Sequence, residues 1–134
     1  MSTAKILIAD DGLVIRTVVS RKLTEAGYEV ATACNGQEAI DKINSEPFDL
    51  LLLDIYMPVL NGIEALRQLR QSYTQIQLPV IMATAKDEEA QVVSCFDDGA
   101  NDFVAKPINF PILFARIETQ LKLKRATEEL ERLK

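Results

Sequence analysis

The chain has 134 residues, of which 48% are hydrophobic, and this size and composition indicate one folded domain with a single core. Its net charge of −5 argues against a broad nucleic-acid interface, because such interfaces depend on clusters of lysine and arginine. The sequence contains no histidine, which excludes Ser-His-Asp and Cys-His catalysis and histidine-based zinc sites within the chain.

Five short apolar runs predict the strands of a sheet. Most of them are continuous runs of Val, Ile and Leu, which is typical of strands buried on both faces of a parallel sheet, whereas residues 28–33 alternate. In chain order the predicted strands are KILIA (5–9), YEVATA (28–33), DLLLLD (49–54), PVIMAT (79–84) and DFVAK (102–106).

Amphipathic patterns between the strands predict helices. They cover residues 13–26, 36–45, 62–71 and 87–97. Gly27 is suited to stop the first of these helices, and Asp87 is suited to cap the last. The alternation of strands and helices predicts an α/β fold, in which a doubly wound parallel sheet carries helices on both faces.

The C-terminal segment is predicted to be one long helix that begins near Phe110 and has Pro111 in its first turn. Its distal part has apolar residues at 3-4-3 spacing, which is typical of a coiled-coil seam. The seam consists of Leu123, Ala126, Leu130 and Leu133. We expect residues 1–121 to form the domain and residues 122–134 to extend its last helix, as a linker, as a dimerisation element or as a solvated tail.

The two cysteines, Cys34 and Cys95, are isolated and form no CxxC motif, which predicts free thiols and a reducing compartment. The stretch MSTAKILIADD has too short an apolar part for a secretory signal, and no stretch approaches a membrane span. We therefore expect a cytoplasmic protein that does not enter the membrane.

Polar residues stand at the carboxyl ends of four predicted strands, the edge where parallel α/β sheets bind ligands. Asp10 and Asp11 follow the first strand, Asp54 ends the third, Thr84 ends the fourth and Lys106 ends the fifth. Three neighbouring carboxylates repel one another unless a cation lies between them, and oxygen ligands suit Mg²⁺. A Mg²⁺ site beside an ammonium group and a hydroxyl meets the needs of phosphoryl transfer to an aspartate, which gives an acyl phosphate.

Each of these residues also has a purely structural explanation. Asp10 and Asp11 suit a helix cap, Thr84 suits an ordinary strand end, and Lys106-Pro107 suits a surface loop. Their coincidence at four strand ends favours a joint site.

The sequence resembles the receiver (CheY-like) domain of bacterial two-component response regulators over residues 4–121. The matching segments are ILIADD, EAGYEVATACNGQEAI, DLLLLDIYMPVLNGIE, PVIMATA and GANDFVAKP. The resemblance implies a flavodoxin-like fold, with a five-stranded parallel sheet in the order 2-1-3-4-5 and five helices. It also implies a phosphoacceptor signalling domain that catalyses its own phosphorylation and slow dephosphorylation, and not an enzyme with a separate substrate.

The resemblance assigns the acceptor and the metal ligands. Asp54 matches the phosphoacceptor, Asp11 the direct Mg²⁺ ligand, and Asp10 an acid that assists through water. The backbone carbonyl of Tyr56 matches a further metal ligand. The Tyr56 side chain occupies a position that tunes phosphate lifetime in the family, as does Lys86.

The resemblance also assigns a switch. Thr84 matches the hydroxyl that hydrogen-bonds the bound phosphoryl group, and Lys106 matches the ammonium that contacts a phosphoryl oxygen. Phe103 matches the aromatic residue that turns inward on activation, here without the hydroxyl of a tyrosine. The peptide bond between Lys106 and Pro107 is implied to be cis.

We therefore expect a receiver that takes a phosphoryl group onto Asp54 from a phosphohistidine, in a Mg²⁺-dependent step of a two-component phosphorelay. The expected donors are a sensor histidine kinase or a histidine phosphotransfer protein, which supply the imidazole that this chain lacks. The switched surface consists of the fourth helix, the fifth strand and the fifth helix. It is expected to act on a downstream effector domain or partner protein, with a homodimer through the last helix as a further expectation and no direct contact with nucleic acid.

The sequence gives less support to two other functional classes. A receiver-like interaction module that works without phosphate would be expected to lack Asp54, Asp11 or Lys106, and all three are present. A Mg²⁺-dependent phosphohydrolase with an aspartyl nucleophile would carry a second acid two residues after Asp54, where this chain has Tyr56. The turn after the first strand has no GxGxxG motif, which argues against a dinucleotide-binding domain.

Overall fold

A computed structural model of the chain describes residues 3–85 and 89–134. The predicted helix cap at Asp87 and the position of Lys86 lie outside the described residues.

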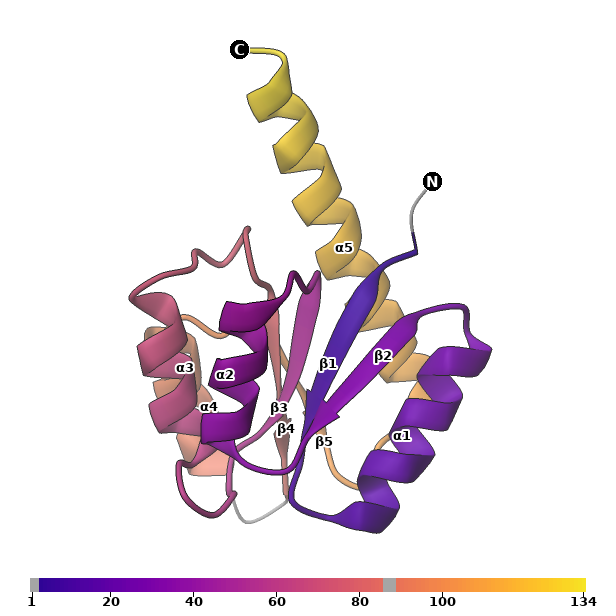
Figure 1. The fold of residues 1–134 in the computed structure, drawn as a ribbon, viewed down its shortest axis with the longest axis vertical. Helices are drawn as coiled ribbons and strands as arrows, with labels where there is room; N and C mark the ends of the chain where they lie inside the picture. Colours follow the sequence, from indigo (N-terminus) through magenta and orange to yellow (C-terminus); the bar gives the residue numbers. More distant parts are fainter. Residues whose placement is uncertain (1–2, 86–88) are drawn as a thin grey trace.

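Five parallel strands form one sheet in the order β2-β1-β3-β4-β5 (Figure 1), which confirms the predicted topology. The strands are β1 (Lys5–Ala9), β2 (Glu29–Ala33), β3 (Leu50–Asp54), β4 (Val80–Thr84) and β5 (Asp102–Ala105). Because β1, β3, β4 and β5 are consecutive neighbours, the four strand ends that carry the predicted site lie along one edge.

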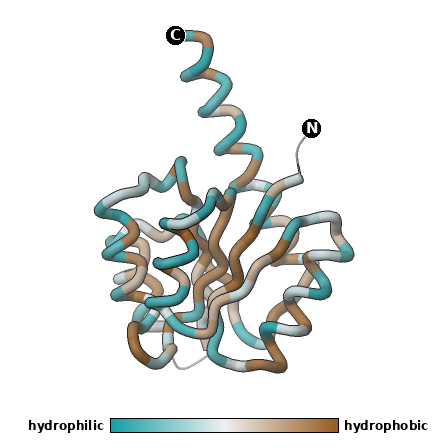
Figure 2. The backbone as a smooth tube through the Cα atoms, viewed as in Figure 1, coloured by the Kyte–Doolittle hydropathy of each residue, from teal (hydrophilic) through white to brown (hydrophobic). Residues whose placement is uncertain are grey.

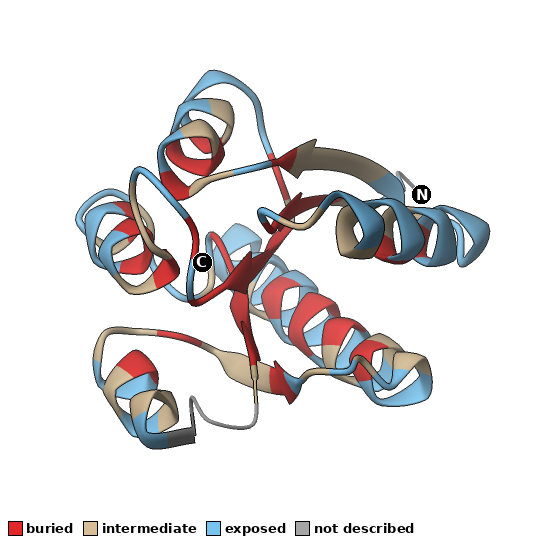
Figure 3. Cartoon of the chain, turned by 90° about the horizontal axis from the view of Figure 1, so that it is seen from below, coloured by how far each residue is buried: buried red, intermediate tan, exposed pale blue. Residues whose placement is uncertain are grey.

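Five helices cover the sheet on both faces (Figures 1 and 3). The helices are α1 (Leu13–Glu25), α2 (Gly36–Ser45), α3 (Gly62–Arg70), α4 (Glu89–Asp97) and α5 (Phe110–Arg132). Buried residues of α1 and α5 pack on one face, and buried residues of α2, α3 and α4 pack on the other. The described part of α4 begins at Glu89, within the predicted range 87–97.

The apolar strands account for the two-layer core. Every residue of β3 and β4 is buried, so both faces of these central strands lie against helices. Successive leucines of β3 alternate between the two cores, with Leu51 and Leu53 on the α2–α3 side and Leu50 and Leu52 on the α1–α5 side. The edge strand β2 is only partly buried, which explains its alternating sequence. Figure 2 shows the hydrophobic residues concentrated along the central strands.

Helix ends follow local side-chain chemistry. The Asn35 and Asn61 side chains accept hydrogen bonds from the backbone N–H groups of Glu38 and Glu64, and the Glu64 side chain completes a capping box at the start of α3. Gly27 follows α1 with a φ of 99°, so it ends the helix in the left-handed conformation, as its position predicts.

The last helix is continuous from Phe110 to Arg132, and its distal part extends beyond the sheet (Figure 1). Lys124 is its last buried residue. The predicted seam faces solvent, since Leu123, Leu130 and Leu133 are 50%, 64% and 68% exposed. Among the described residues, no helix combines the length and the apolar character needed to cross a membrane.

Candidate functional site

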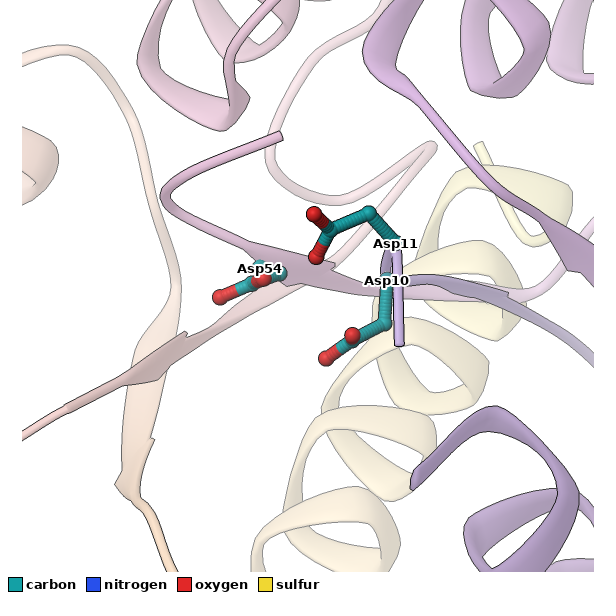
Figure 4. A group of neighbouring side chains, drawn as sticks. All are labelled: Asp10, Asp11 and Asp54. Carbon is teal, nitrogen blue, oxygen red and sulfur yellow. The ribbon is translucent and has the colours of Figure 1, made fainter. Parts of the chain in front are cut away.

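Three carboxylates meet at the carboxyl edge of the sheet. Asp10 and Asp11 directly follow β1, and Asp54 is the last residue of the neighbouring strand β3 (Figure 4). One oxygen of each group lies within 4.8 Å of the others. Asp10 and Asp54 are 6% and 5% exposed, whereas Asp11 is exposed. The predicted acid cluster is therefore present, with one solvent-facing member.

Lys106, just after β5, provides the counter-charge for this cluster. Its Nζ lies 2.9 Å from Asp10 Oδ2 and 3.0 Å from Asp54 Oδ1. Burial by itself would lower the pKa of Lys106, but the hydrogen bonds to Asp10 and Asp54 outweigh it and raise the pKa above that of an ordinary lysine. Lys106 thus stays protonated and holds the two buried carboxylates together.

Two hydrogen bonds that involve backbone groups fix Asp10 in place. The N–H of Gly12 donates to Asp10 Oδ1 over 2.8 Å, and the guanidinium of Arg16 donates to the Asp10 carbonyl over 2.8 Å. The sequence pattern of α1 did not point to this role for Arg16, because a basic residue in the first turns of a helix is usually solvated.

The loop after β3 folds back tightly behind Asp54. The N–H of Gly62 donates to the Ile55 carbonyl over 2.7 Å, and a Cβ atom at position 62 would lie 2.0 Å from the Asp54 carbonyl oxygen. Only a residue without a side chain allows this approach. Gly62 therefore starts α3 and also shapes the loop that borders the acids.

Thr84 is 2% exposed at the end of β4, beside Asp54, because Asp54 pairs with Ala83 in the sheet register. Its hydroxyl donates to the Val104 carbonyl over 3.5 Å, which is long for an O–H···O hydrogen bond. The backbone also joins the two strand ends, since the Lys106 N–H donates to the Thr84 carbonyl over 2.7 Å.

Phe103 lies on β5 between two partners. Its ring makes an edge contact with Phe96 of α4, with centroids 6.2 Å apart, and the Arg116 guanidinium of α5 lies 5.4 Å from its centroid. Arg116 also pairs with Asp102 over 2.8 Å. The predicted switch residue is thus half-buried at the junction of α4, β5 and α5.

Tyr56 follows Asp54 by two residues, and its side chain is 53% exposed. Its hydroxyl accepts a hydrogen bond from the Gln91 side chain of α4 over 3.2 Å. The role of the Tyr56 carbonyl as a metal ligand stays a prediction. The cis peptide bond between Lys106 and Pro107 is present, as predicted.

The donor set of the cluster suits a hard divalent cation. Three carboxylates supply oxygen atoms, and Mg²⁺ prefers oxygen ligands and keeps several waters. The exposed side of the cluster, at Asp11, leaves room for those waters. Cys34 and Cys95, the two softer ligands of the chain, lie outside this cluster and form no disulfide bond.

Comparison with known proteins agrees with this geometry. The sequence profile of the response regulator receiver domain matches residues 6–118, so the chain belongs to the response regulator receiver domain family. Receiver domains of this family serve two-component signalling, in which phosphorylation and Mg²⁺ are general features.

Curated relatives include two bacterial regulators. The alkaline phosphatase synthesis transcriptional regulatory protein PhoP of Bacillus subtilis is 41% identical over 118 residues, which cover 88% of this chain and 48% of the relative. The response regulator MprA of Mycobacterium avium is 38% identical over 127 residues, which cover 95% of this chain and 55% of the relative. The chain thus spans about half the length of these proteins.

Solved structures show the same fold. A CheY-like receiver domain protein of Methanospirillum hungatei has a TM-score of 0.87 and 30% identity, with 94% of this chain and 99% of that chain covered. NtrX of Brucella abortus has a TM-score of 0.90 and 29% identity, with 99% of this chain and 30% of that chain covered.

Proposed function

We propose that this chain receives a phosphoryl group on Asp54 from the phosphohistidine of a sensor histidine kinase or histidine phosphotransfer protein. The observation that carries the proposal is the meeting of Asp10, Asp11 and Asp54 around the Lys106 ammonium at one sheet edge. An acidic pocket with a fixed cation is suited to bind a metal and a phosphoryl group together.

The reaction follows from the side chains present. An Asp54 carboxylate oxygen attacks phosphorus, the P–N bond of the donor breaks, and its electron pair returns to the imidazole. That imidazole belongs to the partner, because this chain has no histidine. Lys106 lies close enough to Asp54 to neutralise charge on the transferred oxygens. Asp10, Asp11 and Asp54 would hold Mg²⁺, which screens the phosphoryl charge from the carboxylates when it is bound.

A groove beside the acids offers a docking surface for the donor. It has a volume of about 720 Å³ and runs between α1 and the segment after Lys106. Leu13 and Val14 on its rim are 69% and 77% exposed, so α1 presents an apolar surface next to the acceptor. We propose that an apolar helical face of the donor lies here and brings its imidazole to Asp54.

The output begins at Thr84. An aspartyl phosphate adds negative charge and acceptor oxygens beside this hydroxyl, which makes a long hydrogen bond to Val104. Movement of Thr84 toward the phosphoryl group would vacate space next to β5, into which Phe103 can turn. The contacts of Phe103 with Phe96 and Arg116 would then change, so the α4-β5-α5 surface is the proposed output toward an effector domain or partner protein.

Phosphorylation can be tested directly. We expect incubation with Mg²⁺ and acetyl phosphate to add the mass of one phosphoryl group in an alkali-labile, acid-stable linkage, and Asp54→Asn to abolish the gain. Omission of Mg²⁺ should slow the reaction strongly. An equal mass gain in the Asp54→Asn variant would show that another residue is the acceptor.

A homodimer through α5 and the location in a reducing, cytoplasmic compartment are further parts of the proposal. The solvent-facing seam of α5 supports the first, and the lack of a disulfide bond at Cys34 and Cys95 supports the second. Light scattering with and without acetyl phosphate, on the full chain and on a chain ending at Leu121, tests the dimer. A monomer mass in every sample would rule it out.

A further inference from the structure

Two polar residues of α5 are buried on the side that faces the domain. Gln120 is 9% exposed and Lys124 is 8% exposed, and they stand one helical turn apart. Both lie toward the amino edge of the sheet, opposite to the acid cluster. Neither takes part in the site described above.

Lys124 connects α5 to the starts of two strands and to the loop before a third. Its Nζ donates to the Gln77 carbonyl over 2.9 Å and lies 3.6 Å from Asp49 Oδ1. Asp49 precedes β3, and its other oxygen accepts the N–H of Lys5, the first residue of β1, over 2.7 Å. One ammonium group thus fixes the helix to the β3 and β1 starts and to the loop before β4.

Gln120 connects the same helix to the start of β5. Its Oε1 accepts a hydrogen bond from Asn101 Nδ2 over 3.2 Å. The Asn101 Oδ1 accepts from the Val80 N–H and from Arg70 Nη2, each over 2.9 Å. Arg70 is buried enough to lower its pKa to about 10, and it also donates to the Gly99 carbonyl over 2.8 Å.

These contacts stand where α5 leaves the domain. Beyond Lys124 every residue is exposed except the half-buried Thr127, and this distal segment extends away from the sheet (Figure 1). An apolar residue at position 124 would pack without the desolvation cost of a charge. A lysine with partners in defined places instead fixes the direction of the helix.

We propose that Gln120 and Lys124 form a polar clamp that makes α5 a rigid arm, so that a displacement of β5 changes the direction of residues 125–132. The transmission of the signal rests on the proposed function, because phosphorylation is the event that moves Phe103 on β5. The rigidity of the arm does not depend on phosphorylation.

Distances between spin labels test the clamp. Labels at Gln68→Cys on α3 and Arg132→Cys on the arm, in a chain with Cys34→Ser, report the arm direction by double electron–electron resonance. Cys95 is 1% exposed and stays unlabelled in the folded chain. We expect one narrow distance distribution in the parent chain and in the control Lys122→Met, which alters an exposed neighbour of the same chemistry. Lys124→Met should broaden the distribution at least twofold.

The width of the distance distribution supports or contradicts the clamp. A distribution in Lys124→Met as narrow as that of the parent would overturn the proposal, as would a broad distribution in the parent chain itself. Gln120→Leu keeps the lysine and removes the contact with Asn101, so it provides the same comparison if Lys124→Met does not fold. A broadened distribution supports the clamp, and an unchanged one contradicts it.

Acetyl phosphate and Mg²⁺ then test transmission in the same labelled chains. With the phosphoryl group confirmed by mass, the parent distance should shift, and Lys124→Met should show no defined shift. An unchanged parent distance would refute transmission. Failure of the phosphoryl group to attach would count against the proposed function. The comparison of the parent chain with Lys124→Met without acetyl phosphate would still test the rigidity of the arm.

Discussion

Replacement of Lys106 by methionine removes the cation that lies 2.9 Å from Asp10 and 3.0 Å from Asp54 and keeps most of the side-chain length. At an effective dielectric constant of about 20, each contact is worth about 6 kcal/mol of Coulomb energy before any desolvation cost. The desolvation cost of the lysine and the protonation or hydration of the freed acids cancel much of this. We expect Lys106→Met to lower the free energy of unfolding by about 2–3 kcal/mol at pH 7.

Urea unfolding in EDTA measures this loss, with Lys122→Met as the matched control. Because Mg²⁺ would take over the neutralisation of the acids, it should raise the thermal midpoint of Lys106→Met more than that of the parent chain. Equal urea midpoints for the parent and Lys106→Met in EDTA would refute the electrostatic reasoning. An equal response to Mg²⁺ would show that the metal and the ammonium do not share the same carboxylates.

Four further outcomes are expected. Gly62→Ala should destabilise the fold by about 3 kcal/mol in urea unfolding, because its Cβ would meet the Asp54 carbonyl oxygen at 2.0 Å. Val59→Asn should raise the free energy of unfolding by about 1 kcal/mol. Val59 is a β-branched residue with a φ of 70°, and asparagine adopts this conformation at a lower cost. Arg70→Met should lower the free energy of unfolding by about 2 kcal/mol, because it removes the donor to the part-buried Gly99 carbonyl and to Asn101 Oδ1. The raised pKa of Lys106 stabilises the fold fully below the ordinary lysine value of 10.5, and this contribution should be lost as the pH rises through the raised value, so alkaline titration should weaken the parent chain more than Lys106→Met.

The sheet and its ligand edge could be predicted from the sequence because a strand that is buried on both faces has a continuous run of apolar residues. Every residue of β3 is buried, so its sequence is a continuous apolar run that ends in Asp54 at the carboxyl edge of the sheet. Because parallel strands place their carboxyl ends together, the strand order alone puts the acids near Thr84 and Lys106.

The polar contacts at the amino edge could not be predicted in the same way. Arg70 and Lys124 are charged residues in amphipathic helices, where such residues normally face water. Their burial depends on carbonyl groups of loops far away in sequence, such as those of Gly99 and Gln77. The spacing of apolar residues along a helix does not identify such partners. The two ion pairs of Lys106, with Asp10 and with Asp54, likewise depend on side-chain positions and could not be predicted from the spacing of residues in the sequence.

The long hydrogen bond from Thr84 to Val104 has a consequence for signal fidelity. A hydroxyl held over 3.5 Å loses little when it rotates away, so this contact adds little to the free-energy gap between the resting conformer and an alternative one. If Thr84 acts as the proposed switch, a small gap would let a fraction of unphosphorylated molecules display the active surface. The gain of the pathway is then set by how far phosphate raises that fraction above its baseline.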